Sequence, residues 1–261
     1  MGLYGDAMVE ALRVGAQSVA TSWGVSPKAT VELLNISENA TFRAVDAAGG
    51  PPTILRVHRP GYHTRAEIES ELDWIDAIRA ASIVETPAPL RTADGARLAE
   101  FSHDGETRYV AAFAFMTGDE PRADADLVAG FEELGAISAR LHRHARGWAR
   151  PAGFTRKHWT FATTIGPTPH WGDWRAAMGL TPDGKAVLER LCGVLEGRLA
   201  AFGDGADRFG LIHADLRLAN LLVDGDRLGV IDFDDCGFGW FVYDFAAAIS
   251  FIEEDPLIPD L

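Results

Sequence analysis

Residues 211–222 read LIHADLRLANLL, and this stretch restricts the possible folds more than any other part of the chain. It places His213, Asp215, Arg217 and Asn220 between two apolar flanks, which are typical of segments that enter a core. Charged groups next to a core are costly unless they are paired or hold a metal ion. The sequence therefore predicts a rigid loop whose polar side chains meet partners from elsewhere in the fold.

The segment that follows this loop supplies further oxygen ligands. Residues 220–233 read NLLVDGDRLGVIDF, and the Asp-Gly turn predicts a hairpin with Asn220 and Asp232 at the same end. Amide and carboxylate oxygens suit Mg2+, with substrate phosphates completing its coordination. Asp215 is placed to accept a proton from a hydroxyl group, and Arg217 to stabilise a transferring phosphoryl group. Together these residues favour phosphoryl transfer.

The order of these residues resembles the signature of the aminoglycoside phosphotransferase/choline kinase-like family. That signature is H-x-D-x-x-x-x-N, then I-D-[FW], then an aspartate that opens a helix; here it is formed by His213, Asp215, Asn220, residues 231–233 and Asp244. It also resembles the catalytic loop and D-F-G motif of protein kinases. The resemblance implies an α+β, protein kinase-like two-lobed fold with an N-lobe antiparallel sheet plus helix and a mainly helical C-lobe. It also implies ATP and Mg2+ as cofactors.

One spacing bears on the acceptor of the phosphoryl group. Asp232 and Asp244 are only twelve positions apart, which leaves no room for the activation loop and A-P-E segment of typical protein kinases. The short link favours a small-molecule hydroxyl acceptor, of the aminoglycoside, choline, sugar or homoserine kind. A protein Ser/Thr kinase of the same family is the alternative.

The first part of the chain has the pattern of a sheet with helices. Alternating apolar residues and turn residues predict the strands, and apolar residues at helical spacing predict the helices. The expected elements are a helix over 1–23, strands over 30–37, 40–46 and 52–59, a helix over 64–82, and a strand pair over 96–102 and 107–116.

Beyond residue 117 the pattern becomes mainly helical, so we expect an N-lobe over 1–116 and a C-lobe over 117–261. The expected C-lobe elements are helices over 125–146 and 182–203, a loop with short helical pieces over 153–179, and a final apolar helix from Tyr243.

The resemblance places a nucleotide site in the N-lobe, although the chain has neither G-x-G-x-x-G nor a Walker A sequence. The polar turn of the first hairpin stands where a phosphate-covering loop is expected, with Ser37, Asn39 and Thr41 as candidate donors. In the fold that the resemblance implies, the end of the last N-lobe strand, where the chain crosses to the C-lobe, presents backbone groups to adenine, and this implies Ala114 and Met116 as the adenine-binding residues.

The third expected strand carries Arg56 where kinases carry a lysine that binds the α- and β-phosphates. Arginine and lysine are not equivalent, but a guanidinium can bridge a phosphate and a carboxylate. The next helix offers Glu71 as that carboxylate, with Glu67 one turn earlier as the alternative. The missing lysine also leaves a catalytically inactive nucleotide-binding protein as an alternative function.

Composition excludes several kinds of partner. The formal net charge is −14 and no Lys/Arg run is present, so we expect no nucleic acid polymer as a partner. No apolar run approaches the ~20 residues that cross a bilayer, so we expect no membrane partner. Two cysteines without metal-site spacing predict a reduced, cytoplasmic protein.

The chain ends soon after the last expected helix. This predicts C-terminal truncation and a loss of acceptor-site helices. It also predicts an exposed apolar surface that favours a homodimer.

The polar and aromatic residues around the signature have predicted supporting roles. His213 is expected to hold the loop by hydrogen bonds, and Asp244 to cap the final helix and brace the loop. Asp234 and Asp235 are either ligands of a metal or cationic substrate, or solvated turn carboxylates. The tryptophans of 153–179 form either a wall for a cation or sugar ring, or a buried cluster that anchors the insertion.

Overall fold

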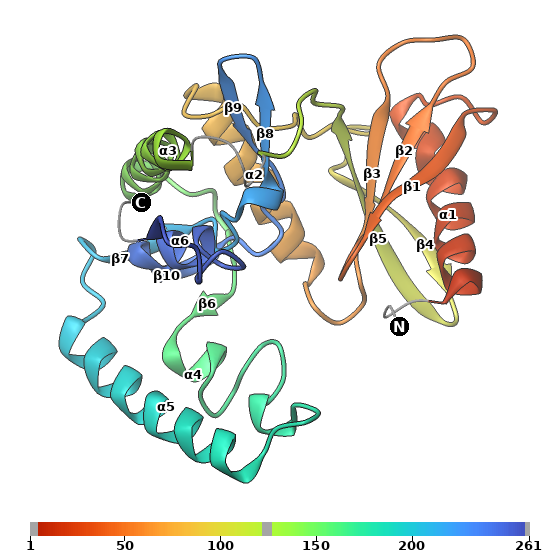
Figure 1. Ribbon diagram of the computed structural model, residues 1–261. Helices are drawn as coiled ribbons and strands as arrows, with labels where there is room; N and C mark the ends of the chain where they lie inside the picture. Colours follow the sequence, from red (N-terminus) through yellow and green to blue (C-terminus); the bar gives the residue numbers. More distant parts are fainter. Residues whose placement is uncertain (1–4, 122–126, 259–261) are drawn as a thin grey trace. The chain divides into compact units, whose positions relative to one another are not determined.

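The computed structural model describes residues 5–121 and 127–258 (Figure 1). The chain divides into two compact units, of which the first consists of 1–120, 150–155 and 221–234 and the second of 121–149, 156–220 and 235–261. The start of the helix expected over 1–23 and residues 125 and 126 of the helix expected over 125–146 lie outside the described residues.

A five-stranded antiparallel sheet forms the centre of the first unit, in the order β1-β2-β3-β5-β4 (Figure 1). Side chains alternate between the two faces of a strand, so one face of this sheet collects the apolar residues that the sequence pattern indicated. The elements are α1 (Asp6–Ala20), β1 (Thr30–Ile36), β2 (Ala40–Val45), β3 (Thr53–Val57), α2 (Arg65–Ala80), β4 (Leu98–His103) and β5 (Glu106–Ala114).

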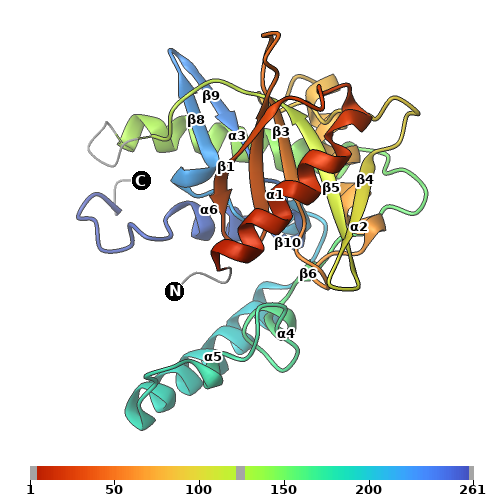
Figure 2. The same ribbon diagram turned by 90° about the vertical axis from the view of Figure 1, so that its right-hand side faces the viewer.

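Helix α1 crosses the sheet of the first unit (Figure 2). Its residues Leu12 and Ala16 are buried in one core cluster with Phe42 of β2 and Leu55 of β3. Helix α2 starts with a capping box, in which Thr64 and Glu67 satisfy each other's backbone amides. The cap fixes the start of α2, and with it the helix face that carries the residues described below.

The hairpin of β8 (Leu221–Asp224) and β9 (Arg227–Val230) belongs to the first unit. Its strands pair antiparallel around Gly225, whose φ of 63° favours glycine. Backbone bonds attach it to the rest of the unit, since the Val230 amide donates to the Glu85 carbonyl and Val223 exchanges two bonds with Asp119. The residues that follow β9 therefore leave from a firmly anchored strand.

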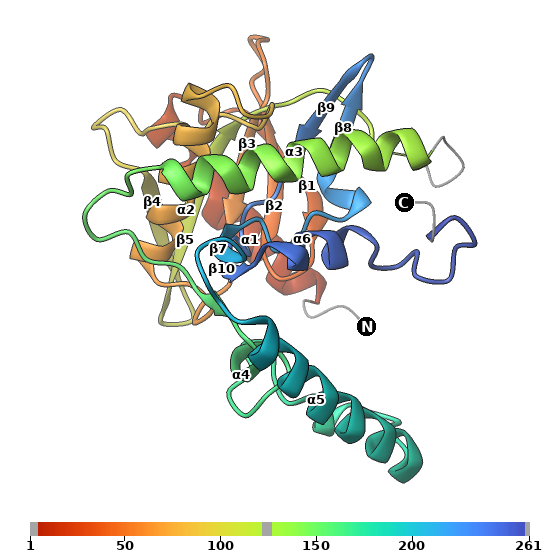
Figure 3. The ribbon, with the colours of Figure 1, turned by 90° about the vertical axis from the view of Figure 1, so that its left-hand side faces the viewer.

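The second unit combines a long helix with a small sheet. Helix α3 packs against β7 and α6 (Figure 3). In the small sheet, β10 lies between β6 and β7. Helix α5 carries no buried residue. The elements are α3 (Leu127–Gly147), β6 (His158–Trp159), α4 (Phe161–Thr164), α5 (Pro182–Phe202), β7 (Phe209–Ile212), β10 (Gly237–Trp240) and α6 (Phe241–Ala248).

The predicted α+β fold with an antiparallel sheet is confirmed, and most expected elements lie within two residues of their predicted bounds. The last helix begins at Phe241, two residues before the predicted start at Tyr243, because the backbone of Trp240 is still extended where β10 ends. Across the described ranges, no helix combines the length and the apolar character that crossing a membrane requires.

Candidate active site

Strand β3 delivers Arg56 to the face of the sheet opposite the apolar core. Its neighbours Leu55 and Val57 are buried with 0% and 2% exposure, and the alternation of the strand turns the arginine the other way. There its NH2 nitrogen lies 2.7 Å from both carboxylate oxygens of Glu71 on α2. The predicted Arg56–Glu71 ion pair is confirmed, and the alternative partner Glu67 is used in the helix cap.

Arg56 is shared among three carboxylates of the first unit. Besides Glu71, its guanidinium lies 3.5 Å from Asp232 and 3.9 Å from Asp234, and the Phe113 ring lies 5.0 Å away. Burial alone disfavours the charged form, but the surrounding carboxylates outweigh it and raise the pKa of Arg56. The site therefore contains a buried permanent cation beside a carboxylate, Asp232, that is 45% exposed.

The turn of the first hairpin is only partly free to meet a ligand. The side chain of Asn39 donates from Nδ2 to Asp234 over 2.7 Å, and its backbone carbonyl accepts from the Ser37 amide. Ser37 itself is exposed, while Thr41 lies in β2 directly opposite Arg56. The structure thus brings Asn39 and Thr41 to the Arg56 cluster and leaves Ser37 at the tip of the turn.

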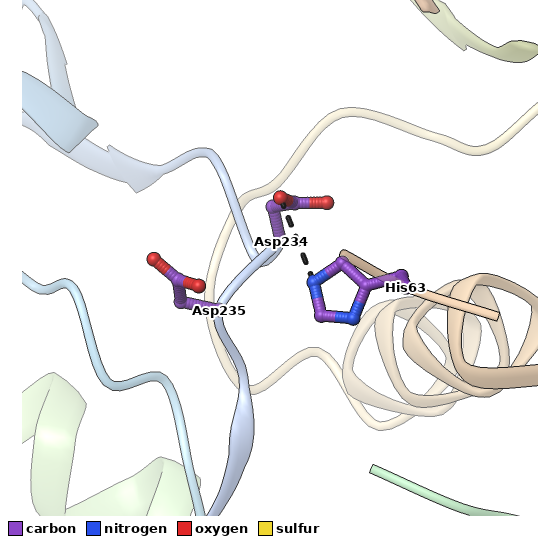
Figure 4. Close-up of side chains that lie close together, drawn as sticks. All are labelled: His63, Asp234 and Asp235. Carbon is purple, nitrogen blue, oxygen red and sulfur yellow. Dashed lines mark ion pairs between the residues drawn. The ribbon is translucent and has the colours of Figure 1, made fainter. Parts of the chain in front are cut away.

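Two histidines that the sequence analysis missed surround Asp234. His58 Nδ1 lies 3.4 Å from Oδ1. His63 Nε2 lies 3.7 Å from Oδ2 (Figure 4). Burial raises the pKa of Asp234, yet Arg56, His58 and His63 together hold it well below its usual range. Burial and the nearby Arg56 lower the pKa of His58. Asp234 is 7% exposed, so the reading of it as a solvated turn carboxylate is wrong.

The end of β5 and the segment after it carry the two residues expected to bind adenine. The Ala114 amide donates to the Ala88 carbonyl, and Met116 packs so closely on Gly229 that a Cβ there would overlap its methyl group. The segment lines a pocket of about 460 Å³ in the first unit. The pocket is lined by Arg79, Glu85, Thr86, Pro87, Ala88, Ala114, Phe115, Met116, Thr117, Asp224 and Arg227.

The loop after β7 in the second unit holds Asp215 by several contacts. Asn220 Nδ2 donates to the Asp215 carboxylate at 2.6 Å and to its carbonyl at 2.9 Å, and Arg217 Nε lies 3.2 Å from the carboxylate. The Asp215 amide donates to Nδ1 of the fully buried His213 over 3.2 Å. The predicted supporting role of His213 is confirmed, and Asp215, Arg217 and Asn220 form one cluster.

Asp244 braces the backbone of the same loop through hydrogen bonds. Its carboxylate accepts from the amides of Ala214, at 2.7 Å, and His213, at 3.2 Å, and lies 2.7 Å from His142 Nε2. This bracing was predicted, but the predicted capping is wrong. Asp244 lies inside the first turn of α6, whose N-cap is Trp240, and its side chain bonds to the loop rather than to the helix. Ala214 has a φ of 69°, a strained conformation that this bracing supports.

The two predicted metal ligands lie in different units. Asn220 ends the second unit's loop, and Asp232 follows β9 in the first unit, with a φ of 60°. Between them the hairpin pairs Leu221 with Val230. Because Asn220 uses its Nδ2 on Asp215, its carbonyl oxygen is the side-chain atom that remains for a cation. Both residues therefore offer hard oxygen atoms, the donor type that Mg2+ prefers.

The tryptophans of 153–179 divide between the two predicted alternatives. Trp159 is fully buried and donates from Nε1 to the Asp235 carbonyl at 2.7 Å, so it anchors the insertion. Trp171 stacks on it at 4.6 Å and is 49% exposed, while Trp174 donates to the Ile165 carbonyl. Trp171 is thus the most exposed of these three tryptophans, and Trp174 is partly exposed.

Tyr243 is a further residue of the second unit that the sequence analysis did not single out. Burial, followed by the charges of Asp235, Asp215 and Asp244, raises the pKa of Tyr243 to about 12. The raised pKa keeps the phenol protonated to a higher pH than in an ordinary tyrosine, and a protonated phenol is a hydrogen-bond donor. No sequence signal identifies it, because its effect depends on carboxylates up to 28 positions away.

These contacts define the chemistry that each unit offers. The first unit combines a buried arginine with an exposed carboxylate, Asp232, and a polar turn. The second offers an oriented carboxylate, Asp215, next to a guanidinium, Arg217. A base, a cation near the phosphates and oxygen ligands for a metal are what phosphoryl transfer requires.

Comparison with known proteins points to one family. The sequence profile of the phosphotransferase enzyme family matches residues 30–259. An uncharacterised protein of Deinococcus radiodurans is 30% identical over 234 residues, which cover 87% of this chain and 63% of that protein. Amicoumacin kinase of Bacillus subtilis is 25% identical over 131 residues, which cover 49% of this chain and 36% of that kinase. The chain thus spans less than two thirds of the length of these curated relatives.

Solved structures agree with the match to the phosphotransferase enzyme family. A microcompartment-associated aminopropanol kinase is 46% identical, with a TM-score of 0.86 over 94% of this chain and 76% of that one. An amicoumacin kinase bound to AMP-PNP and Ca2+ shares the fold, with 21% identity and a TM-score of 0.75 over 98% of this chain and 72% of that one. The protein kinase-like character of the predicted fold is therefore confirmed.

Proposed function

Because the chain belongs to the phosphotransferase enzyme family, we propose that it transfers the γ-phosphoryl group of ATP to the hydroxyl group of a small molecule. The observation that carries the proposal is the loop around Asp215. Asn220 and Arg217 contact this carboxylate directly, and Asp244 fixes the backbone that leads to it. A carboxylate held in this way orients a hydroxyl group for attack.

In the proposed reaction the acceptor oxygen attacks the γ-phosphorus, the bond from that phosphorus to the β,γ-bridging oxygen breaks, and ADP leaves. Asp215 accepts the hydroxyl proton. Arg217 stabilises negative charge on the transferring group. The contribution of these residues is mainly positioning and electrostatic stabilisation, which dominate catalysis of phosphoryl transfer.

The first unit is proposed to bind the nucleotide. Arg56, fixed by Glu71, takes the role of the lysine that binds the α- and β-phosphates in kinases. A guanidinium keeps its charge when buried, and its planar donors suit both a carboxylate and a phosphate. Ser37 and the backbone around Asn39 in the turn, together with Thr41 in β2, are the proposed phosphate donors. Ala114 and Met116 remain the proposed adenine contacts.

Asn220 and Asp232 are the residues proposed to hold Mg2+. The side chains of both residues carry hard oxygen atoms, the donor type that Mg2+ prefers, and Asn220 bonds to Asp215 through Nδ2 rather than through its carbonyl oxygen. When bound, Mg2+ would neutralise charge on the β- and γ-phosphates. An amicoumacin kinase of the same fold binds an ATP analogue together with a divalent cation, Ca2+, which supports a divalent cation beside the nucleotide.

The acceptor is proposed to be a small amino alcohol. The support is the 46% identity to an aminopropanol kinase. The carboxylates whose charges reach Tyr243 also suit a cationic substrate, because opposite charges raise its local concentration. The predicted cytoplasmic location and homodimer stay predictions.

A transfer assay with ATP labelled at the γ-phosphate tests the proposal. The acceptors are 1-amino-2-propanol, ethanolamine, choline, spectinomycin, homoserine and a generic protein substrate, each with and without Mg2+. We expect a labelled phosphate ester from 1-amino-2-propanol. Label in the protein substrate alone would support the protein Ser/Thr kinase instead. Mg2+-dependent nucleotide binding without hydrolysis or transfer to any acceptor would support the catalytically inactive alternative.

A further inference from the structure

Asp234 is a buried carboxylate for which the proposed reaction has no role so far. It follows Asp232 by two positions in the segment after β9. Between them, Phe233 is 1% exposed and meets the ring of Trp74 on α2 edge-on at 5.5 Å. The segment is therefore fixed to α2 on one side, and Asp234 provides the contacts on the other.

The carboxylate of Asp234 connects three separate parts of the first unit. Its Oδ2 accepts from Asn39 Nδ2 in the β1–β2 turn at 2.7 Å and lies 3.7 Å from His63, which precedes α2. Its Oδ1 lies 3.4 Å from His58, just after β3, and 3.9 Å from NH2 of Arg56. Both oxygens thus face donors or cations of the protein.

Asn39 transmits this contact to the backbone. Its Nδ2 is held by Asp234, and its Oδ1 accepts from the Arg59 amide at 3.0 Å. The side chain thereby ties the β1–β2 turn to the end of β3. Any movement of Asp234 changes the position of the turn that is proposed to cover the phosphates.

Arg56 gives Asp234 a second effect. Glu71 is the nearest carboxylate to the guanidinium, at 2.7 Å, followed by Asp232 at 3.5 Å and Asp234 at 3.9 Å. Asp232 and Asp234 therefore compete with each other for an ion pair with the same guanidinium. If Asp234 loses its charge, Asp232 no longer shares Arg56 with it and pairs more strongly with the guanidinium. A carboxylate held by an arginine is a weaker ligand for a cation, because the two positive charges compete for the same oxygen atoms.

We propose that Asp234 is a positioning residue that keeps Asp232 available to a divalent cation by retaining Arg56, and that fixes the β1–β2 turn through Asn39. The inference deepens the proposed function and rests on it, since it assumes that Asp232 is a metal ligand. The two aspartates then have different roles: Asp232 binds the cation, and Asp234 contacts Asn39 and Arg56.

The test is the Mg2+ dependence of nucleotide binding in Asp234→Asn. Binding of a non-hydrolysable ATP analogue to the full chain is measured by calorimetry over a series of Mg2+ concentrations. We expect the Mg2+ midpoint to rise about tenfold, the size of one lost charge-assisted contact. In the transfer assay the Mg2+ midpoint rises in parallel, while kcat at saturating Mg2+ stays within about threefold. A purely structural role would lower the folded fraction and leave the midpoint unchanged.

Three further variants sharpen the test. Asp76→Asn removes a carboxylate of α2 that pairs with Arg97 instead of the cluster, and it should bind nucleotide and Mg2+ as the parent does. Asn39→Ala should weaken nucleotide binding, with little further loss when it is combined with Asp234→Asn, because both remove the same bond. Asp234→Glu keeps the charge and should restore part of the Mg2+ midpoint.

The outcomes separate the positioning role from the proposed function. A parent protein that shows no Mg2+-dependent nucleotide binding contradicts the proposed function. A parent that binds, with an Asp234→Asn variant of unchanged midpoint, overturns only the positioning role. If Asp234→Asn does not fold, Asn39→Ala decides, and unaltered nucleotide affinity in that variant also overturns the proposal.

Discussion

Glu71 is the buried partner of Arg56, and its replacement by glutamine isolates the contribution of this ion pair. The carboxylate is 0% exposed, and both its oxygens lie 2.7 Å from one nitrogen of Arg56. Loss of one partner from a buried pair typically costs about 3–5 kcal/mol. Glutamine keeps one acceptor, and Arg56 keeps Asp232 and Asp234 nearby, so we expect the lower end, about 3 kcal/mol.

Urea denaturation of Glu71→Gln measures this loss. With an m value of about 2–3 kcal/mol/M, a loss of about 3 kcal/mol lowers the midpoint by about 1–1.5 M. Glu69→Gln is the matched control on the same helix, because its pair with Arg65 is exposed and should contribute about 0.5 kcal/mol or less. Equal midpoints for Glu71→Gln and Glu69→Gln would refute the argument that burial makes the Arg56–Glu71 pair essential.

The remaining predictions concern a buried histidine and the support of the Asp215 loop. The pKa of His58 is lowered in the fold, so the imidazole binds a proton more tightly in the unfolded chain than in the folded protein. The free energy of unfolding should therefore fall as the pH drops below about 6.5, by at most about 1.4 kcal/mol per pH unit. His58→Asn should flatten that part of a pH series of urea midpoints, and an unchanged slope would contradict the assignment. Asp244→Asn should reduce stability by about 2 kcal/mol and lower kcat, because a buried carboxylate that accepts from two loop amides loses its charge. Chemical denaturation and the transfer assay check it, and full activity at parental stability would show that the loop needs no bracing.

Local patterns accounted for the parts of the fold that the sequence predicted well. The alternation around Arg56 placed it on the face of β3 opposite Leu55, and the helical spacing of α2 offered Glu71 as its partner. The spacing within 213–220 was sufficient to group Asp215, Arg217 and Asn220, because all three lie in one short loop.

Contacts between residues far apart in sequence could not be predicted in this way. Asn39 and Asp234 are 195 positions apart, and His142 and Asp244 are 102 positions apart. Each contact depends on how whole elements pack, which no local pattern encodes. The same reason explains the wrong capping role of Asp244. A cap at Asp244 requires a helix that starts at the next residue, but the end of β10 sets the start of α6 at Phe241, four residues before that position.

The central claim is that Asp215 orients and deprotonates the acceptor hydroxyl. It is tested most directly by single-turnover transfer from labelled ATP to 1-amino-2-propanol in Asp215→Ala, with nucleotide affinity measured on the same sample. The account predicts a loss of transfer of about a thousandfold, within the range known for positioned bases, and nucleotide binding within about threefold of the parent. Transfer at the parental rate in a variant that lacks this carboxylate would contradict it.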